Sequence, residues 1–337
     1  MVHKNNGSKL FKCIAAATAA FSLVFITGCD KRESNAYKTS YIMSTVVTQQ
    51  LTGTESESAA AKIEELLYGF EDETSLYTDG SYVREINEAA GTDAVEIDES
   101  EYALLLNAKE CCEKSGGIFD VSVGPLTLLW NINGENPRVP ESEAVAFAAS
   151  LVDYSKLELF TRESKYYARL NTMGGALDLG GVAKGYSLDL CKESLIESGI
   201  NYGFVSIGGN VLVYGDKDGR GFNVGLRVPE KDSDGSFCVL NLRNTVVSTT
   251  GGYERFFVED GVTYHHVLDP RTGYPAKTDL ISVSVVNESG LTADVLSTWL
   301  YIIGLDEATK TANENGYEVV LVDENNNVYV SRSLEDN

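Results

Sequence analysis

The sequence predicts an α+β fold in which mixed or mainly antiparallel sheets pack against helices. Helix-like and strand-like stretches interleave without the regular strand–helix–strand period of a parallel sheet. The glycine-rich segment 180–185 does not match the dinucleotide fingerprint GxGxxG, and the sequence contains no GxxxxGK(S/T) motif. A Rossmann dehydrogenase and a P-loop enzyme are therefore poor interpretations.

The first 28 residues have the features of a bacterial lipoprotein signal peptide. Three lysines precede an apolar run, 13–26, that is too short to span a bilayer comfortably. Residues 26–29, Ile-Thr-Gly-Cys, resemble a lipobox, in which the Cys29 thiol receives a diacylglycerol and the new N-terminus an acyl chain such as palmitate. We expect an extracytoplasmic protein held at the cell (inner) membrane by this lipid, with residues 29–36 as a polar tether. The alternative is an ordinary signal peptide that has a cysteine near its cleavage site.

Five helices are predicted from apolar residues at helical spacing and from signals at the helix ends. Thr54 and Glu57 form a capping box in front of the first helix, and Gly116–Gly117 stops the second. The expected helices include Ile63 to Phe70 and then cover about 99–115, 184–199, 292–304 and 306–315.

Strands are expected in stretches rich in Thr, Val and Tyr and punctuated by glycine. They lie at 37–51, 167–178 and 204–226, near Val246 and Arg255, at 281–286, and in a last hairpin turned at 325–327. The roughly 300 residues that follow the signal peptide are enough for one large domain or two subdomains with cores of their own.

The chain is strongly acidic, with 27 basic and 50 acidic residues and a formal net charge of −23. Because the charge is spread along the chain, it indicates a solvated surface, and nucleic acid is a poor partner. An anionic ligand would need a local cation or a helix N-terminus to offset this field. The cysteines have neither CxxC nor Cys/His metal spacing.

Two glycine-rich segments could bring the backbone close to a ligand. Residues 178–186 read Asp-Leu-Gly-Gly-Val-Ala-Lys-Gly-Tyr. Glycines followed by a helix N-terminus, with Lys184 beside them, make a plausible seat for a pyrophosphate. Residues 205–210 read as a strand that ends in two glycines and Asn210. Taken alone, the first segment could equally be a tight strand-to-helix turn and the second a hairpin or a bulge.

Two further segments carry groups suited to catalysis. His265 and His266 are adjacent, so on a strand only one of them should enter a given site. Imidazole can take a proton from a hydroxyl nucleophile near neutral pH, although a structural role for the pair is an open alternative. Asp294 and Thr298 lie four residues apart, on one face of a helix near its start. These hard oxygen ligands suit Mg²⁺, although Asp294 alone could serve only the helix N-terminus.

Together these segments resemble the ApbE family, the FAD:protein FMN transferases. The resemblance covers about residues 37–323, and weaker echoes include Met43-Ser44-Thr45, where the family usually has Met-Gly-Thr. If that glycine lets the backbone approach the flavin, Ser44 alters the fit of FAD. The family motifs of the types DLGGIAKGY, Gly-Gly-Asn, HHILDPxTGYP and ADxLST match residues 178–186, 208–210, 265–275 and 293–298.

The resemblance implies an ApbE-like catalytic domain, 37–337, of two intimately packed subdomains. It also implies that this domain cleaves FAD with Mg²⁺ and transfers FMN to a Thr or Ser hydroxyl, releasing AMP. The implied acceptor is an exported protein with a flavinylated Thr or Ser, such as the FMN subunit of a redox complex. Two alternatives remain open: an FAD pyrophosphatase that uses water as the acceptor, and a non-enzymatic flavin-binding lipoprotein.

The resemblance also implies roles for individual residues. His266 is the expected general base, with His265 as the second choice. Mg²⁺ is expected on Asp294, Thr298 and a backbone carbonyl near Ala183. Tyr77 is expected to stack on a ring of FAD, and Asp189 to give polar support one helix turn beyond Lys184. The residues expected to bind FAD are Met43, Tyr77, Asp120, Gly180, Gly181, Lys184, Asp189, Gly209 and His266.

Overall fold

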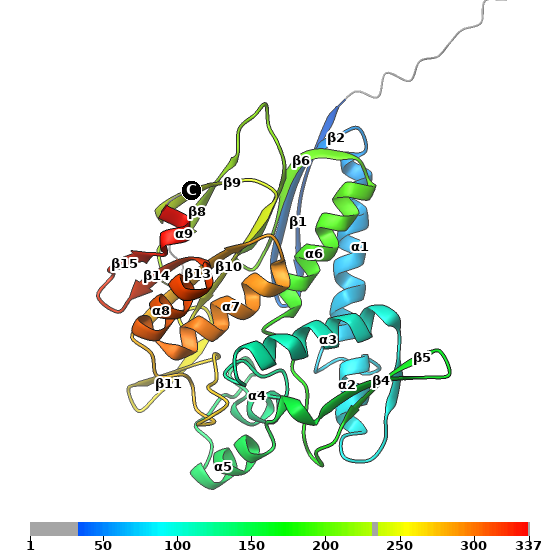
Figure 1. The fold of residues 1–337 in the computed structure, drawn as a ribbon, viewed down its shortest axis with the longest axis vertical. Coiled ribbons are helices and arrows are strands. Elements are labelled where there is room, and N and C mark those ends of the chain that lie inside the picture. Colours follow the sequence, from blue (N-terminus) through cyan, green and yellow to red (C-terminus); the bar gives the residue numbers. More distant parts are fainter. Residues whose placement is uncertain (1–32, 231–234, 336–337) are drawn as a thin grey trace, which may run out of the picture. The chain divides into compact units, whose positions relative to one another are not determined.

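An eight-stranded antiparallel sheet is the largest element of the structure, a computed structural model that describes residues 33–230 and 235–335 (Figure 1). The predicted signal peptide and Cys29 lie outside the described residues. The strands, in sheet order, are β1 (Ser34–Ile42), β2 (Thr45–Gly53), β6 (Ile200–Ile207), β7 (Asn210–Gly215), β10 (Thr245–Gly251), β13 (Leu280–Asn287), β14 (Glu318–Asp323) and β15 (Val328–Val330).

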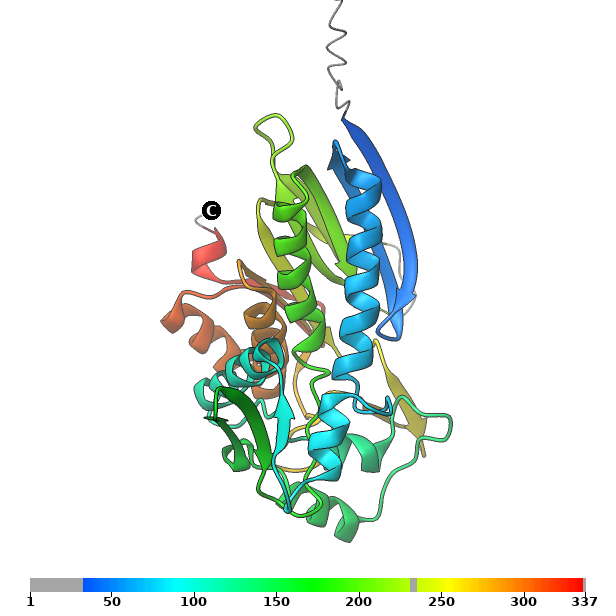
Figure 2. The ribbon, with the colours of Figure 1, turned by 90° about the vertical axis from the view of Figure 1, so that its right-hand side faces the viewer.

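Helices cover one face of this sheet and form the first hydrophobic core with it. They are α1 (Ser56–Thr74), α6 (Ala183–Glu197), α7 (Gly290–Ile303) and α8 (Leu305–Asn315). Figure 2 shows α1 and α6 side by side along the strands, where they contact each other. The hairpin of β8 (Phe222–Arg227) and β9 (Ser236–Leu242) packs on Val213, Val247 and Val286 in a separate apolar cluster.

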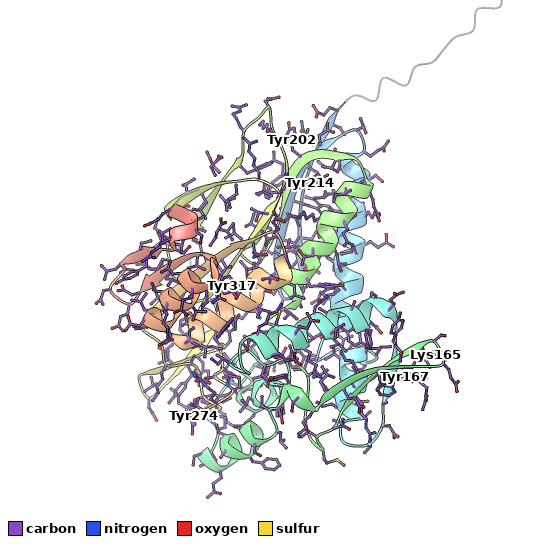
Figure 3. The ribbon with its side chains drawn as sticks, viewed as in Figure 1. Lys165, Tyr167, Tyr202, Tyr214, Tyr274 and Tyr317 are labelled. Atoms are coloured by element: carbon purple, nitrogen blue, oxygen red, sulfur yellow. The ribbon has the colours of Figure 1, made fainter. Side chains whose placement is uncertain are left out.

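A second large core lies beside the first within the same compact unit. It contains α2 (Tyr82–Glu88), α3 (Glu99–Lys114) and the three-stranded sheet β3 (Val95–Ile97), β5 (Lys165–Leu170) and β4 (Leu157–Arg162). Figure 3 shows Lys165 and Tyr167 on this small sheet, away from the large one. The remaining elements are α4 (Gly124–Trp130), α5 (Ser142–Ser150), a 3₁₀ turn (Tyr154–Lys156), β11 (Phe256–Glu259), β12 (Val262–His265) and α9 (Arg332–Glu335).

The α+β prediction is confirmed, and the starts of α3, α6, α7 and α8 lie within two residues of the predicted ones. The short helices α2, α4 and α5 were not predicted, because seven to nine residues give too few turns for a helical period to stand out. Within the described residues, no helix combines the length and the apolar character needed to cross a membrane.

Two local predictions near the N-terminal end of the domain were wrong. The predicted capping box at Thr54–Glu57 is absent, since α1 begins after Glu55 without a side-chain cap. The reciprocal box occurs instead at the start of α3, between Asp98 and Glu101. Residues 34–36, expected in the tether, belong to β1 because they pair with β2 and bury Ala36.

The β1–β2 turn contains Ser44, the residue at which this chain departs from the family motif. Met43 and Ser44 form a two-residue hairpin loop and both have positive φ, 56° and 55°. This conformation, typical of a type I′ turn, favours glycine because a Cβ there is strained. Ser44 therefore strains the turn.

We predict that Ser44→Gly raises the free energy of unfolding by about 0.5–1 kcal/mol, because glycine adopts positive φ without a steric cost. Urea denaturation measures the change. Thr39→Gly, at an exposed position of extended backbone in β1, is the control and should destabilise the protein. Destabilisation by both changes would contradict the account of the turn.

Candidate active site

The amino-terminal turns of α6 and α7 cross at a distance that only glycine permits. A Cβ on Gly185 would lie 2.1 Å from the carbonyl oxygen of Gly290, and a Cβ on Gly290 would lie 2.2 Å from the carbonyl oxygen of Gly185. Both distances are far shorter than a van der Waals contact. The two glycines therefore hold the two helix N-termini against each other.

Each of these helices supplies a carboxylate that caps the other. Asp189 of α6 accepts hydrogen bonds from the N–H groups of Gly290 (2.6 Å) and Leu291 (3.0 Å) at the start of α7. Asp294 of α7 accepts a hydrogen bond from the N–H of Gly185 (2.9 Å) at the start of α6. The unpaired N–H groups and the positive end of each helix dipole favour these carboxylates. The crossing is thus stabilised reciprocally.

Asp294 is buried, and side chains from three other elements fix its carboxylate. Oδ1 accepts hydrogen bonds from the amide of Asn210 (2.9 Å) and the hydroxyl of Ser248 (2.9 Å). The ammonium group of Lys184 lies 3.7 Å from Oδ2. Thr298 follows one turn later on α7 and lines the same cavity as Asp294. The carboxylate is therefore held in one orientation toward that cavity.

Most of the residues predicted to form the site surround this one cavity, which has a volume of about 330 Å³. It is within the usual range for a small-molecule site, at the lower end. The predicted residues that line it are Met43, Tyr77, Asp120, Gly180, Gly181, Ala183, Lys184, His266, Asp294 and Thr298.

Two residues predicted to bind FAD do not line the cavity. Asp189 instead faces the start of α7, where it caps the backbone, so it acts on the site through the helix that carries Asp294. Gly209 is the second residue of the two-residue β6–β7 turn, with φ of 94°, and a Cβ there would meet open space. Gly208, its neighbour in the turn, lines the cavity in its place.

Two further carboxylates that line the cavity, Asp178 and Asp120, are fixed by hydrogen bonds within loops. Asp178 accepts hydrogen bonds from the N–H of Gly180 (2.8 Å) and the hydroxyl of Thr127 (2.7 Å). Asp120 accepts hydrogen bonds from the backbone N–H groups of Ser122 (2.8 Å) and Tyr154 (3.0 Å), while burial raises its pKa. Asp178 was not predicted to belong to the site, although it opens the glycine-rich motif.

His266 faces the cavity, whereas His265 points away from it, as the alternation along a strand predicts. His265 contacts the Ala276 carbonyl (3.1 Å) and the Tyr301 ring. The Nδ1 atom of His266 lies 3.2 Å from the Arg255 carbonyl, so it carries the proton and leaves Nε2 as the acceptor. Burial and then the charge of Arg255 lower the pKa of His266 to about 3. His266 is therefore neutral at pH 7.

Arg255 is a residue of the site that sequence reasoning missed. It lines the cavity, and its guanidinium donates a hydrogen bond to the carbonyl of Ser44 (3.2 Å) in the β1–β2 turn. Only its position as a basic residue close to the histidine motif could have indicated it. Lys184 and Arg255 are the cations among the described residues that line the cavity, and they could offset the charge of an anionic ligand.

The segment that follows His266 is anchored to α4 by aromatic packing. The indole N–H of Trp130 donates a hydrogen bond to the carbonyl of Gly273 (2.7 Å), and its ring contacts Tyr264 and Tyr274. Figure 3 shows Tyr274 near β11 and α5. The residues of the histidine motif around Gly273 thus have a structural role, because they fix the loop that follows His266.

Within the described residues, no group of three or more His, Cys, Asp or Glu side chains could hold a metal. The cavity does offer two hard oxygen ligands, the carboxylate of Asp294 and the hydroxyl of Thr298, which are compatible with one Mg²⁺. A carboxylate has about four lone-pair positions, and Asp294 uses three of them for Gly185, Asn210 and Ser248. The remaining position faces Lys184. One carboxylate position and a hydroxyl suit Mg²⁺, which usually keeps several waters and takes substrate phosphates.

Comparisons with known proteins agree on one family. The model of the ApbE family matches residues 43–321. An FAD:protein FMN transferase of Treponema pallidum is 35% identical over 272 residues, 77% of this chain and 75% of that protein. One of Klebsiella pneumoniae is 30% identical over 276 residues, 82% of this chain and 85% of that protein.

Solved structures show the same fold. The ApbE protein of Thermotoga maritima matches with a TM-score of 0.83 at 31% identity, covering 90% of this chain and 98% of that one. The flavin transferase ApbE from Vibrio cholerae matches with a TM-score of 0.78 at 24% identity, covering 90% and 99%. At that lower identity the likeness concerns the fold alone.

We predict that Gly185→Ala lowers the free energy of unfolding by about 3 kcal/mol, since the new Cβ would collide with the backbone of α7. Thermal or urea denaturation measures the loss. Gly69→Ala, in α1 where a Cβ meets nothing within 4 Å, is the matched control and should stabilise the protein by about 0.5–1 kcal/mol. Equal effects of the two changes would refute the close crossing.

A second prediction concerns pH and His266. Its pKa is about 3 in the folded protein and 6.5 in a free chain, so between these values the unfolded state binds a proton that the folded state does not. The free energy of unfolding should therefore fall as the pH drops below about 6.5. Between pH 7 and pH 5, the free energy of unfolding of the wild-type protein should fall by about 2 kcal/mol more than that of the His266→Gln variant. Parallel losses in urea titrations of both proteins would contradict the burial of a neutral imidazole.

Proposed function

The chain belongs to the ApbE family, and from this premise we propose that it transfers FMN from FAD to a hydroxyl group of an acceptor protein. The FAD:protein FMN transferases among its relatives support this activity. The observation that carries the proposal is the single cavity in which a helix N-terminus, a lysine, a buried carboxylate and a neutral histidine meet. These groups match the chemistry of phosphoryl transfer, which depends on positioning and charge neutralisation.

The pyrophosphate of FAD is proposed to lie at the start of α6. The glycine-rich loop 180–181 lets the backbone come close there, and Lys184 adds a positive charge. Lys184 is able to turn toward a phosphate, because the described residues hold its ammonium by one hydrogen bond, to the Gly180 carbonyl at 3.4 Å, and one ion pair, to Asp294 at 3.7 Å. Tyr77 lines the cavity and is 59% exposed, which leaves its ring accessible for stacking on a ring of FAD.

Mg²⁺ is the proposed metal, held by Asp294, Thr298 and a backbone carbonyl near Ala183. When bound, it supplies positive charge that stabilises the phosphoryl oxygens of FAD. Because the Asn210 and Ser248 hydrogen bonds hold Oδ1 of Asp294, the remaining carboxylate position needs no rearrangement to accept a ligand. Lys184 competes for that position until a phosphate draws it away.

His266 is the proposed general base. A Thr or Ser hydroxyl of the acceptor attacks the phosphorus on the riboflavin side of the pyrophosphate, and Nε2 of His266 takes the hydroxyl proton. A new P–O bond to the acceptor forms as the P–O bond to AMP breaks, and AMP leaves. A pKa near 3 makes this imidazole a weak base by itself, and the negative charge of the phosphates of FAD would raise that pKa.

We also propose that the protein is extracytoplasmic and anchored to the cell (inner) membrane by a lipid on Cys29. The charged n-region, the short apolar run and the lipobox-like residues 26–29 support this assignment. An enzyme in that place meets exported proteins, so its acceptor is an exported flavoprotein with a modified Thr or Ser. Mass spectrometry of the membrane-bound protein tests the anchor, and an unmodified Cys29 would overturn it.

The decisive experiment incubates the purified protein with FAD, Mg²⁺ and an acceptor domain that contains a candidate Thr. AMP release together with an acceptor mass gain equal to an FMN phosphoester is the expected result. AMP and free FMN without an adduct would favour an FAD pyrophosphatase. The absence of AMP would leave a flavin-binding protein.

His266→Gln in the same assay should lower the rate of transfer by about 10²–10⁴-fold, the usual contribution of a general base. The affinity for FAD, followed by flavin fluorescence, should change little because the glutamine keeps a polar side chain in the cavity wall. An equal loss of binding and transfer would assign His266 a structural role.

Thr298→Val should raise the Mg²⁺ concentration needed for half-maximal activity by about tenfold, because valine keeps the shape of the side chain but removes a ligand oxygen. The measurement is a Mg²⁺ titration of AMP release. Thr292→Val, on the same helix and outside the cavity lining, is the control and should leave the titration unchanged. An unaltered Mg²⁺ dependence of the Thr298 variant would remove this residue from the metal site.

A further inference from the structure

Arg255 and His266 lie opposite each other at the base of the β11–β12 hairpin. The strand register pairs Phe256 with His265, and the N–H of His266 donates a hydrogen bond to the Arg255 carbonyl (3.1 Å), which continues the ladder by one pair. Opposite residues of antiparallel strands project to the same face, with Cβ atoms about 4.5–5.5 Å apart. Both side chains line the cavity of the candidate site. The guanidinium and the imidazole therefore enter that cavity side by side.

The guanidinium of Arg255 is held in place without an anionic partner. Within the described residues it donates one hydrogen bond, to the Ser44 carbonyl (3.2 Å), whereas a guanidinium has five N–H donors. No carboxylate of the described residues forms an ion pair with it, and the neighbouring carboxylate of Glu254 pairs with Arg227 instead. A strongly acidic chain thus leaves this cation of the cavity unpaired, with N–H groups that can donate to a phosphate.

The other cation among the described lining residues, Lys184, lies beside a different group. Its ammonium is 3.7 Å from Oδ2 of Asp294, where α6 and α7 cross. After burial, the charge of Arg255 is the main cause that lowers the pKa of His266, and the charge of Lys184 contributes less. Two cations in two places suit a ligand that has two phosphates.

The position of the base decides which phosphate Arg255 meets. In FMN transfer, the acceptor hydroxyl attacks the phosphorus on the riboflavin side of FAD, and the general base must lie within reach of that hydroxyl. Arg255 adjoins His266, the proposed base, whereas Lys184 adjoins the carboxylate of Asp294. Arg255 is therefore the cation placed for the riboflavin-side phosphate.

We propose, on the premise of the proposed function, that Arg255 binds the phosphate on the riboflavin side of FAD and holds its phosphorus beside the acceptor hydroxyl. A planar guanidinium can donate two parallel hydrogen bonds to the oxygens of one phosphate. The Ser44 carbonyl and the strand ladder fix the direction in which Arg255 presents these donors. When the bond between the two phosphates breaks, FMN keeps the phosphate on Arg255 and AMP leaves with the other one. Arg255 therefore recognises FMN and not AMP.

Two pairs of ligands separate the contact with a phosphate from the stacking of rings. FMN and riboflavin differ only in the phosphate, as do AMP and adenosine. Their affinities for the purified protein are measured without Mg²⁺ or acceptor, by flavin fluorescence and isothermal titration calorimetry. Arg255→Gln should lower the ratio of FMN affinity to riboflavin affinity about tenfold, because a charge-assisted pair of hydrogen bonds is lost. The ratio of AMP affinity to adenosine affinity should stay unchanged.

Two further variants complete the test. Arg255→Lys keeps the charge but not the two parallel hydrogen bonds, so it should lower the FMN ratio about threefold, and it carries the test if the glutamine variant does not fold. Arg243→Gln removes the same charge from an exposed ion pair with Asp216, outside the cavity lining. It is the matched control and should leave both ratios unchanged.

An FMN ratio that stays unchanged in the Arg255 variants, or an AMP ratio that falls as much as the FMN ratio, would overturn the assignment of Arg255. Failure of the proposed function has a different outcome, because the binding measurements need no turnover. A protein that prefers FMN over riboflavin through Arg255 but releases no AMP in the transfer assay would refute the transfer and not the phosphate contact.

Discussion

The close crossing of α6 and α7 is the contact on which the candidate site depends. Gly185 and Gly290 let the backbones touch, and Asp189 and Asp294 each cap the other helix. The cap on α6 is also the buried carboxylate of the cavity, so the group that stabilises the helix crossing is the one that we propose as a metal ligand. A side chain at either glycine would separate the helices and move that carboxylate.

An acidic chain that binds an anionic substrate needs positive groups at the binding site. The net charge of −23 repels phosphates at a distance, so binding relies on local positive groups. The N-terminus of α6, Lys184 and Arg255 provide them on the cavity wall. Arg255 also holds the turn at Ser44 and helps to keep His266 neutral. Arg255 thus contacts the β1–β2 turn, lowers the pKa of His266 and lines the cavity.

The same site shows how structural and chemical roles divide within one sequence motif. His266 is half-buried and lines the cavity, whereas the residues after it form a loop fixed by the Trp130–Gly273 hydrogen bond. Asp269 contributes to that loop by accepting two hydrogen bonds from the guanidinium of Arg271 and one from its backbone N–H. A rigid loop suits the base that we propose, because a base works only when its acceptor nitrogen is held toward the reacting proton.

The sequence alone determined the features that depend on neighbours along the chain. Asp294 and Thr298 share a helix face by their spacing, the glycine loop precedes Lys184, and alternation sends His265 and His266 to opposite sides. Only the tertiary structure decided which distant groups meet. Asp189 contacts the start of α7 and does not line the cavity, whereas Arg255 does line it. Periodicity reports which face of an element is buried, but not which other element covers it, because that choice rests on contacts between residues far apart in the chain.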